Sequence, residues 1–419
     1  MSEIFADLII EHAAQLLTLN TSKTGPVLRP VKDDLGIIED GFVAIDDTGR
    51  IIATGKTEDI NISLKPGGRR ISARGMVVMP GFVDPHSHIV FGGNRIEEIK
   101  MRLAGKTYLE IQKAGGGINF TVAATRGASE EELLDRAGQV ISFMLKHGTT
   151  TLETKSGYGL NKEVEIKMLH IINELNKKYQ MDIVSTFLGA HIVPKEFLNN
   201  RNEYIRLLIE EMMPAAGEVA EFCDVFCEEG AFSVDESRKI LLAGKSMGLL
   251  PRIHAEQLSC IGGAELAGEI KALSADHLEY ISREGISSMA ANRVVAVLLP
   301  GATFFMNLDR YAPARTMIEE GVPVALATDY NAGSCWTYSM QMIMSLACIK
   351  MKMTPEEAIV ASTVNSACAL NREDSVGTLE TGKYGDLIIC DVPDYSLLPF
   401  YFGANHVVTV IKKGKVVFE

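Results

Sequence analysis

The sequence has no apolar run long enough to cross a membrane and no segment that resembles a secretion signal. Its longest apolar stretches, such as 76–83, are interrupted by Pro and Gly and fall well short of the roughly 18 residues that a membrane span needs. The N-terminus, MSEIFADLII, lacks a basic start followed by an apolar stretch. These absences exclude a transmembrane protein and predict a cytoplasmic one.

Basic residues are also too few to suggest a nucleic-acid partner. The chain carries 41 Lys and Arg against 54 Asp and Glu, a formal net charge of −13, and it has no basic run. A protein with this charge binds a phosphate backbone poorly. With 419 residues, 47% hydrophobic and 23% charged, the chain has the composition of a folded globular protein rather than a disordered or fibrous one.

The seven cysteines are odd in number and form no CxxC pair. No disulfide framework is therefore expected, and the pattern indicates reduced thiols in a cytoplasmic protein. Cys223 and Cys227 are separated by three residues, which is loose for a zinc knuckle, and no second pair accompanies them.

Both ends of the chain have the pattern of short β-strands. Near the start, 41–45 leads through the turn DDTG into a second β-prone run, and near the end, 407–411 leads through KKGK into another. Both patterns predict β-hairpins. We expect one small composite β-sandwich domain built from residues 1–76 plus 371–419, with the middle of the chain inserted between its two parts.

Between residues 77 and 370, apolar strands alternate with helical stretches, which is typical of parallel strands with crossover helices. The candidate strands are 77–84, 149–153, 182–188, 222–227, 250–253, 272–276, 294–299 and 324–328. Eight such units fit a (β/α)8 TIM barrel. A doubly wound open sheet is the alternative, but it usually has a Gly-rich nucleotide loop after its first strand, where this chain has DPHSH. In a TIM barrel, catalytic groups lie at the C-terminal ends of the strands.

Histidines and one aspartate follow four of these strands. His86 and His88 follow the first strand with i, i+2 spacing, so both imidazoles can face one ion. His254 ends the fifth strand, His277 the sixth and Asp329 the eighth. An isolated HxH would fit two polar loop residues equally well. Because a closed barrel brings all these strand ends together, their convergence predicts a metal site.

The order of these residues resembles the amidohydrolase superfamily. Longer segments are similar to imidazolonepropionases, a family within it that opens the ring of 4-imidazolone-5-propanoate to give N-formimino-L-glutamate in histidine degradation. These segments are DPHSH with VFGGNR, GGGI, TKSGYGL, TFLGAH and SADHL. The resemblance covers essentially the whole chain, and KSGYGL and TFLGAH are its most specific parts.

The resemblance implies one metal ion held by four ligands, which are His86, His88, His254 and Asp329. The fourth strand ends in FCEE, so the carbamylated lysine that bridges two metals in some amidohydrolases has no candidate there. Glu228, at the end of that strand, is kept as an alternative that would bridge a second ion. Three imidazoles and a carboxylate suit Zn²⁺ or Fe, and the sequence leaves both open.

The expected chemistry is hydrolysis by a metal-activated water. A bound metal lowers the pKa of its water toward neutrality, and Asp329 beside that water can accept the proton. The resemblance places His277 where it would orient the water or stabilise charge at the carbonyl, and His191 where it would polarise the substrate carbonyl. For His277, the alternative is a core histidine beside Asp276.

The substrate has a propanoate tail, for which a guanidinium is the natural bidentate partner. The resemblance assigns the tail to Arg95. It also implies a set of further substrate contacts, which are Tyr108, Tyr158, His191, Gln257, Asn331, Gly333 and Ser334. For Tyr108, packing within a helix is an open alternative.

Two positions depart from the family pattern. Gln257 stands where related enzymes, some imidazolonepropionases included, have glutamate. An amide cannot shuttle protons but can hydrogen-bond ring nitrogens, which favours ring opening over deamination. Ala332 replaces a common proline and leaves the neighbouring Asn331, Gly333 and Ser334 in place.

Two alternative functions remain open at this point. One is another cyclic-amide hydrolase or an aminohydrolase of the same superfamily, and the other is a barrel that has lost its metal and serves as a scaffold. The expected partners are a small-molecule substrate and, from the resemblance, a second copy in a homodimer. Neither nucleic acid nor a membrane is expected.

Overall fold

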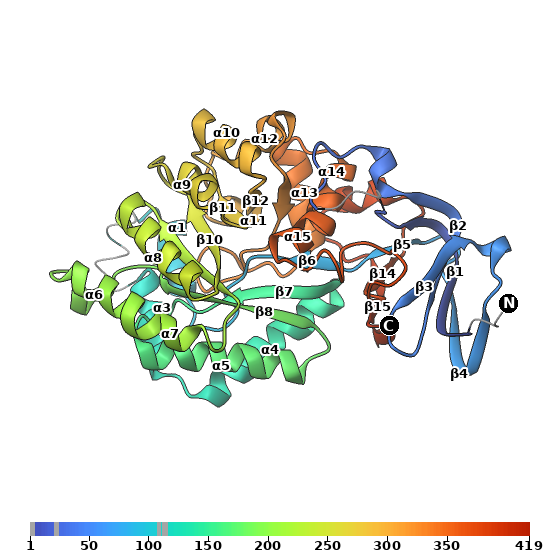
Figure 1. The fold of residues 1–419 in the computed structure, drawn as a ribbon, viewed down its shortest axis with the longest axis horizontal. Helices are drawn as coiled ribbons and strands as arrows, with labels where there is room; N and C mark the ends of the chain where they lie inside the picture. The colour runs from blue at the N-terminus through green and yellow to red at the C-terminus, as the bar shows by residue number, and fades with distance from the viewer. Residues whose placement is uncertain (1–4, 21–24, 107–109, 111–115) are drawn as a thin grey trace.

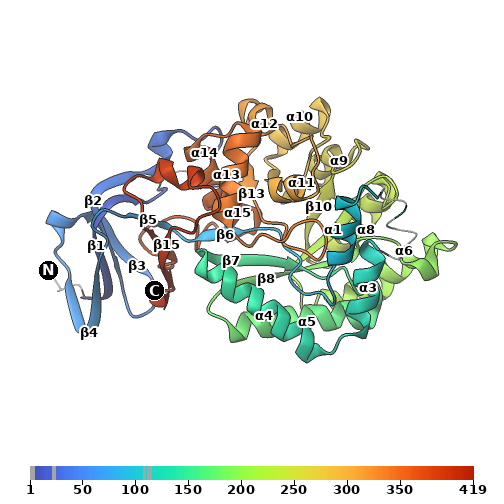
Figure 2. The ribbon, with the colours of Figure 1, turned by 180° about the vertical axis from the view of Figure 1, so that it is seen from behind.

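The structure, a computed structural model, describes residues 5–20, 25–106, 110 and 116–419. It consists of a barrel surrounded by helices and a β-sheet domain beside it (Figure 1). Both ends of the chain lie on the side of the sheet domain, and the view from behind shows the same arrangement (Figure 2).

The barrel strands are parallel and follow one another around the barrel in chain order. They are β6 (Phe82–Asp84), β7 (Thr149–Lys155), β8 (Asp182–Ala190), β9 (Phe222–Cys227), β10 (Leu250–Ala255), β11 (Ser274–His277), β12 (Val295–Leu298) and β13 (Val324–Leu326). The predicted TIM barrel is confirmed.

The barrel closes just beyond the ends of β6 and β13. Asp329 N donates to His86 O over 3.0 Å, and His88 N donates to Tyr330 O over 2.8 Å. Thr328 donates to the Asp84 carboxylate through both its backbone N and its Oγ1. The seam of the barrel therefore joins the HxH segment to the Asp329 segment.

Helices cover the outside of the barrel in both ribbon views. They are α1 (Ile96–Leu103), α3 (Ile118–Gly127), α4 (Glu130–Lys146), α5 (Lys162–Lys178), α6 (Arg201–Leu207), α7 (Met213–Ala216), α8 (Val234–Ser246), α9 (Gly263–Ile270), α10 (Arg283–Asn292), α11 (Pro300–Phe305), α12 (Ala314–Glu320), α13 (Met340–Met351), α14 (Pro355–Ala361) and α15 (Val364–Ala369). Local sequence sets several of their starts. At α4, Ser129 and Glu132 form a reciprocal capping box, which satisfies two backbone N–H groups at the helix start.

The second sheet is built from both ends of the chain. Its strands are β1 (Phe5–Leu17), β2 (Ile37–Ile45), β3 (Ile51–Lys56), β4 (Ser63–Ser72), β5 (Val77–Pro80), β14 (Leu387–Cys390), β15 (Val407–Lys412) and β16 (Lys415–Phe418). Their order is β16-β15-β14-β5-β1-β2-β3, with β4 also paired to β1. The join between the two ends is the antiparallel pair of β14 and β5. The composite β domain predicted from the termini is confirmed, and both predicted hairpins are present.

The single strand predicted over 77–84 is wrong. The structure divides it at Gly81, so that β5 joins the terminal sheet and β6 joins the barrel. A β-carbon at Gly81 would collide with the side chain of Thr150, which explains why glycine occupies the crossing point. The division of the chain into residues 1–76 plus 371–419 and residues 77–370 stays a prediction. Because β5 pairs within the terminal sheet, the chain passes from that sheet to the barrel at Gly81.

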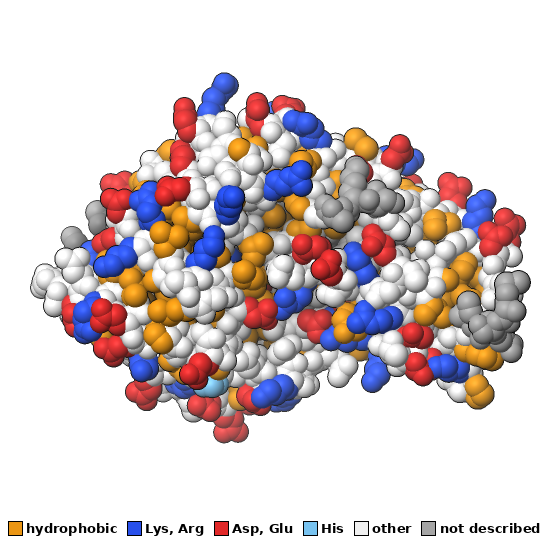
Figure 3. Space-filling model, viewed as in Figure 1, with side chains coloured by type: hydrophobic (Ala, Val, Ile, Leu, Met, Phe, Trp, Pro, Cys, Tyr) orange, Lys and Arg blue, Asp and Glu red, His pale blue; other side chains and the backbone are white. Residues whose placement is uncertain are grey.

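The surface carries charges of both signs. On the face drawn in Figure 3, Lys and Arg side chains are interspersed with Asp and Glu. Among the described residues, no helix combines the length and apolar character that crossing a membrane would require.

Candidate active site

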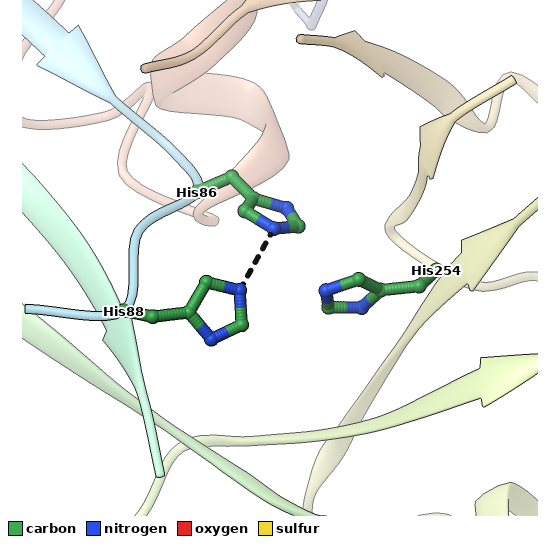
Figure 4. Close-up of side chains that lie close together, drawn as sticks. All are labelled: His86, His88 and His254. Carbon is green, nitrogen blue, oxygen red and sulfur yellow. Dashed lines mark hydrogen bonds between the residues drawn. The ribbon is translucent and has the colours of Figure 1, made fainter. Parts of the chain in front are cut away.

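Three buried imidazoles converge at the C-terminal end of the barrel (Figure 4). His86 and His88 follow β6, and His254 lies near the end of β10. One ring nitrogen from each lies within 4.8 Å of the others, and the Nε2 atoms of His86 and His88 are 3.3 Å apart. Asp329 Oδ1 lies 3.6 Å from His86 Nε2 and 3.7 Å from His88 Nε2. The residues predicted as metal ligands are thus adjacent.

Carboxylates on neighbouring strands orient two of these rings. His86 Nδ1 lies 2.6 Å from Asp276 Oδ2, and His254 Nδ1 lies 3.0 Å from Asp224 Oδ1. Because a carboxylate can only accept, each Nδ1 carries the proton and each Nε2 keeps its lone pair. This arrangement is typical of histidine ligands in metal sites.

The free nitrogens fit a metal ion. His254 Nε2 is buried and has no hydrogen-bond partner among the described residues. Burial holds the pKa of His86 and of His88 well below the ordinary value, so their rings are neutral, as ligation requires. A donor set of three neutral imidazoles and one carboxylate suits a transition metal such as Zn²⁺ or Fe.

A fully buried charge network lies beneath the three histidines. Lys155 Nζ is 2.8 Å from Glu153 Oε1 and 3.0 Å from Asp224 Oδ2. Arg252 Nη2 is 3.0 Å from Asp276 Oδ2. The two cations therefore compensate the carboxylates that orient the histidines, because an unpaired charge at this depth would be costly.

A cavity of about 660 Å³ opens above the histidines. Its polar lining includes nearly all the predicted site residues, which are His88, Arg95, Tyr158, His191, His254, Gln257, His277, Asp329, Asn331 and Ser334. Its apolar lining includes Ile118, Ile192, Phe226 and Leu258. The size and mixed lining suit a small molecule with polar and apolar parts.

His191 and Tyr158 form one wall of the cavity. His191 Nδ1 donates to Gly157 O over 3.0 Å, so its Nε2 has no proton. The ring stacks on His88 with centroids 5.4 Å apart, and burial lowers its pKa to about 3. Glu165 holds the loop that carries Tyr158. Its carboxylate accepts hydrogen bonds from the backbone N of Gly157 and of Gly159, on either side of Tyr158.

Arg95 forms a bidentate ion pair with Glu98. Its Nε and Nη2 lie 2.7 and 2.6 Å from the two carboxylate oxygens. Glu98 also accepts from Gly117 N over 2.9 Å. The pair fixes the plane of the guanidinium while Arg95 still lines the cavity.

Asn331 builds the turn that follows Asp329. Its side-chain oxygen accepts from the backbone N of Gly333 and of Ser334, and its nitrogen donates to Asp329 O and to Ser334 Oγ. These bonds hold the turn without the proline that Ala332 replaces. The hydrogen bonds of the Asn331 amide are therefore made within the turn, whereas Ser334 also lines the cavity.

Other sequence candidates lie apart from the histidines. Glu228 accepts from Leu258 N, Glu229 N and Ser259 Oγ, so it holds the loop that carries Gln257 and is outside the metal-competent group found among the described residues. Tyr108 lies outside the described residues.

Sequence reasoning did not single out Glu153, Lys155, Asp224, Arg252 or Glu279. A signal existed for the four that lie in strands, all but Glu279, because charged residues inside buried strands need a buried partner. Glu153 and Lys155 have i, i+2 spacing on β7, as Arg252 and His254 have on β10. That spacing places each pair on one side of its strand.

Comparisons with known proteins agree with this geometry. The model of the Amidohydrolase family matches residues 77–417. The imidazolonepropionase of Alkaliphilus oremlandii is 48% identical over 417 residues, which cover 99% of this chain and 98% of that protein. The imidazolonepropionase of Geobacillus kaustophilus is 49% identical over 415 residues, covering 98% and 97%.

Solved structures with the same fold are more distant in sequence. A zinc-bound adenosine deaminase from Xanthomonas campestris has a TM-score of 0.71 at 17% identity, covering 99% of this chain and 94% of that one. A 5-methylcytosine deaminase from Klebsiella pneumoniae has a TM-score of 0.73 at 16% identity, covering 98% and 97%. These matches show the fold, and the close relatives show the family. The chain belongs to the imidazolonepropionase family of the amidohydrolase superfamily.

Proposed function

We propose that the protein opens the ring of 4-imidazolone-5-propanoate by hydrolysis of a cyclic amide C–N bond, giving N-formimino-L-glutamate. The observation that carries this proposal is the combination of a metal-competent histidine cluster with Arg95 in one cavity. Such a cavity offers an activated water to a ring and a cation to its carboxylate tail. The close relatives of this chain are imidazolonepropionases along their whole length.

We infer that His86, His88, His254 and Asp329 hold a single ion, either Zn²⁺ or Fe. When bound, the ion supplies Lewis-acid activation of a water molecule. Glu228 supports one ion rather than two, since its carboxylate is occupied by the loop at 258–259.

Asp329 is the group that takes the proton of the attacking water. Its Oδ1 lies beside the Nε2 atoms of His86 and His88, at the floor of the cavity. Burial raises the pKa of Asp329 well above its usual value. Having accepted the water's proton, the carboxyl group can pass it on to the leaving ring nitrogen.

His191 and His277 flank the reacting carbonyl from two sides. His277 lies beside His86 and His254, with ring centroids 5.5 and 5.4 Å away. His191 lies over His88 on the opposite wall. Burial holds the pKa of His277 well below the ordinary value, so both rings are neutral. His277 can donate its N–H to the carbonyl oxygen, whereas His191, whose Nδ1–H bonds to Gly157 O, offers Nε2 as an acceptor to an N–H of the substrate ring and so fixes where the carbonyl lies.

Arg95 binds the propanoate tail, and Tyr158, Gln257 and Ser334 surround the ring and the amide. Gln257 can donate to one ring nitrogen and accept from another, and it has no proton to give to a departing ammonia. This chemistry favours ring opening over the aminohydrolase alternative. Tyr108, Asn331 and Gly333 complete the proposed substrate-binding set, Asn331 by building the turn that carries Gly333 and Ser334.

We also propose a cytoplasmic homodimer. Support for a reducing compartment comes from the free state of all seven cysteines. The dimer rests on the family alone, and size-exclusion chromatography with light scattering tests it directly.

Turnover of 4-imidazolone-5-propanoate by metal-analysed protein tests the proposed activity. The expected products are N-formimino-L-glutamate without released ammonia. Ammonia release, or turnover of other cyclic amides in preference to this one, would support the alternative hydrolase or aminohydrolase. No turnover by fully loaded protein would support a scaffold.

A further inference from the structure

Two buried polar atoms face one another beside the histidine cluster without a hydrogen bond between them. His277 Nδ1 and Glu279 Oε2 are 3.9 Å apart. Both atoms are buried, and neither has a hydrogen-bond partner among the described residues. Since nearly all buried polar atoms in folded proteins are paired, two adjacent exceptions need an explanation.

The backbone between them is held in a costly conformation. His277 has φ of 83° and Leu278 has φ of 71°, a region that side chains other than glycine rarely adopt. Such strain persists where the surroundings enforce it, and it concentrates at functional sites. Here it turns the chain sharply at the end of β11, so that residues 277 and 279 lie next to each other.

Four hydrogen bonds fix the position of Glu279. Leu278 N donates to Ala255 O over 3.1 Å, and Tyr280 N donates to Glu256 O over 2.8 Å. Arg310 Nε donates to the backbone oxygen of Glu279 over 2.7 Å. Its carboxyl Oε1 accepts from Thr303 Oγ1 over 2.9 Å, which leaves Oε2 pointed at His277.

We propose that Glu279 is a positioning residue that holds the His277 ring through Nδ1 and thereby presents Nε2 to the reacting carbonyl and water. The proposal rests on the proposed function, because His277 is assigned its role there. A movement of about 1 Å closes the present gap to an ordinary hydrogen bond.

The same arrangement, a carboxylate bonded to Nδ1 of a histidine, already occurs twice in this site. Asp276 holds His86 through Nδ1, and Asp224 holds His254 through Nδ1. Glu279 would be the third carboxyl group to do so, acting on a histidine that is no metal ligand. Either protonation state of Glu279 can complete the bond, because an ionised carboxylate accepts from Nδ1–H and a protonated carboxyl donates to a bare Nδ1.

The kinetic test compares Glu279→Leu with Glu279→Gln in the metal-loaded enzyme. Glu279→Leu should lower kcat by about 10- to 100-fold, with KM and metal content nearly unchanged. Glu279→Gln should recover most of the loss, because the amide can still bond to Nδ1. Glu357→Leu, which removes an equally buried glutamate from the start of α14, should change stability and leave kcat unchanged.

Two outcomes overturn the proposal kinetically. One is a kcat for Glu279→Leu equal to that of the wild type. The other is a further loss when Glu279→Leu is added to His277→Ala, because a residue that acts only through His277 should then have no effect.

The tautomer of His277 gives a readout that needs no turnover. In the zinc-loaded protein, ¹⁵N imidazole NMR should show one tautomer of His277 in the wild type and in Glu279→Gln, and a mixture in Glu279→Leu. Identical His277 spectra in all three would overturn the proposal. If the wild type fails to open the imidazolone ring, the proposed function fails, and these spectra still decide whether Glu279 holds His277.

Discussion

Gly333 lies directly against the guanidinium of Arg95. A β-carbon at residue 333 would overlap Nη1, Cζ and Nε of Arg95. Because residue 333 has no side chain, the guanidinium of Arg95 fits against its backbone, while the Glu98 carboxylate accepts from Nε and Nη2 of that guanidinium. The loop after β13 and the loop after β6 meet at this pair.

Replacing Gly333 with alanine should therefore displace Arg95. The backbone of Gly333 does not lie in the left-handed region, so alanine is tolerated by the main chain and the effect should appear as a rise in KM of about 10-fold or more, the cost of a weakened charge-assisted hydrogen bond. Steady-state kinetics on the propanoate substrate measure it. Gly127→Ala is the control, since a β-carbon there meets nothing within 4 Å.

Arg95→Met should raise KM by roughly 10- to 100-fold, because it removes charge-assisted bonds to the carboxylate tail. It also removes the cation that faces the Glu98 carboxylate, which adds repulsion toward the tail. Glu98→Gln keeps the guanidinium and should affect KM less. An unchanged kcat/KM in Arg95→Met would contradict the assignment of the tail to this residue.

Removal of the carboxylate behind a ligand should weaken metal binding without emptying the site. Asp224→Asn is expected to lower affinity by about 10- to 100-fold, the usual cost of losing such a partner. His254→Ala should lower it further, since a ligand itself is lost. Metal content after dialysis against a graded chelator compares the two, and full retention by both would contradict the assignment.

Asp329→Asn should separate metal binding from chemistry. The carboxamide still offers a weak oxygen ligand but accepts no proton, so single-turnover rates on metal-saturated protein should fall by about 10²-fold or more. Gln257→Glu introduces a carboxylate at this position and should leave ring opening largely intact. Near-normal chemistry in Asp329→Asn together with its loss in Gln257→Glu would reverse the two roles.

Lys155→Met should destabilise the barrel itself. It would leave Glu153 and Asp224 buried without their cation, and breaking a buried pair in this way costs about 3 to 5 kcal/mol. Denaturant unfolding of the metal-free protein measures the change. Lys415→Met, at an exposed position, should change stability little.

The sequence by itself determined the alternation of strands and helices, the composite domain from both ends, and the strand ends that carry His86, His88, His254 and Asp329. Each of these follows from local periodicity and from the rule that parallel strand ends meet on one side of a barrel. Family resemblance then added roles that spacing alone could not assign.

Tertiary structure decided the rest. The break at Gly81 depends on the close approach of Thr150, and the pairs of Asp276 with His86 and of Asp224 with His254 depend on which strands are neighbours. Such contacts join residues distant in the chain, and no local pattern contains their distances. Glu279 and His277 are close in sequence, yet their side chains face each other only because residues 277 and 278 have positive φ values. That turn is held by hydrogen bonds to the backbone oxygens of Ala255 and Glu256 and from the side chains of Thr303 and Arg310.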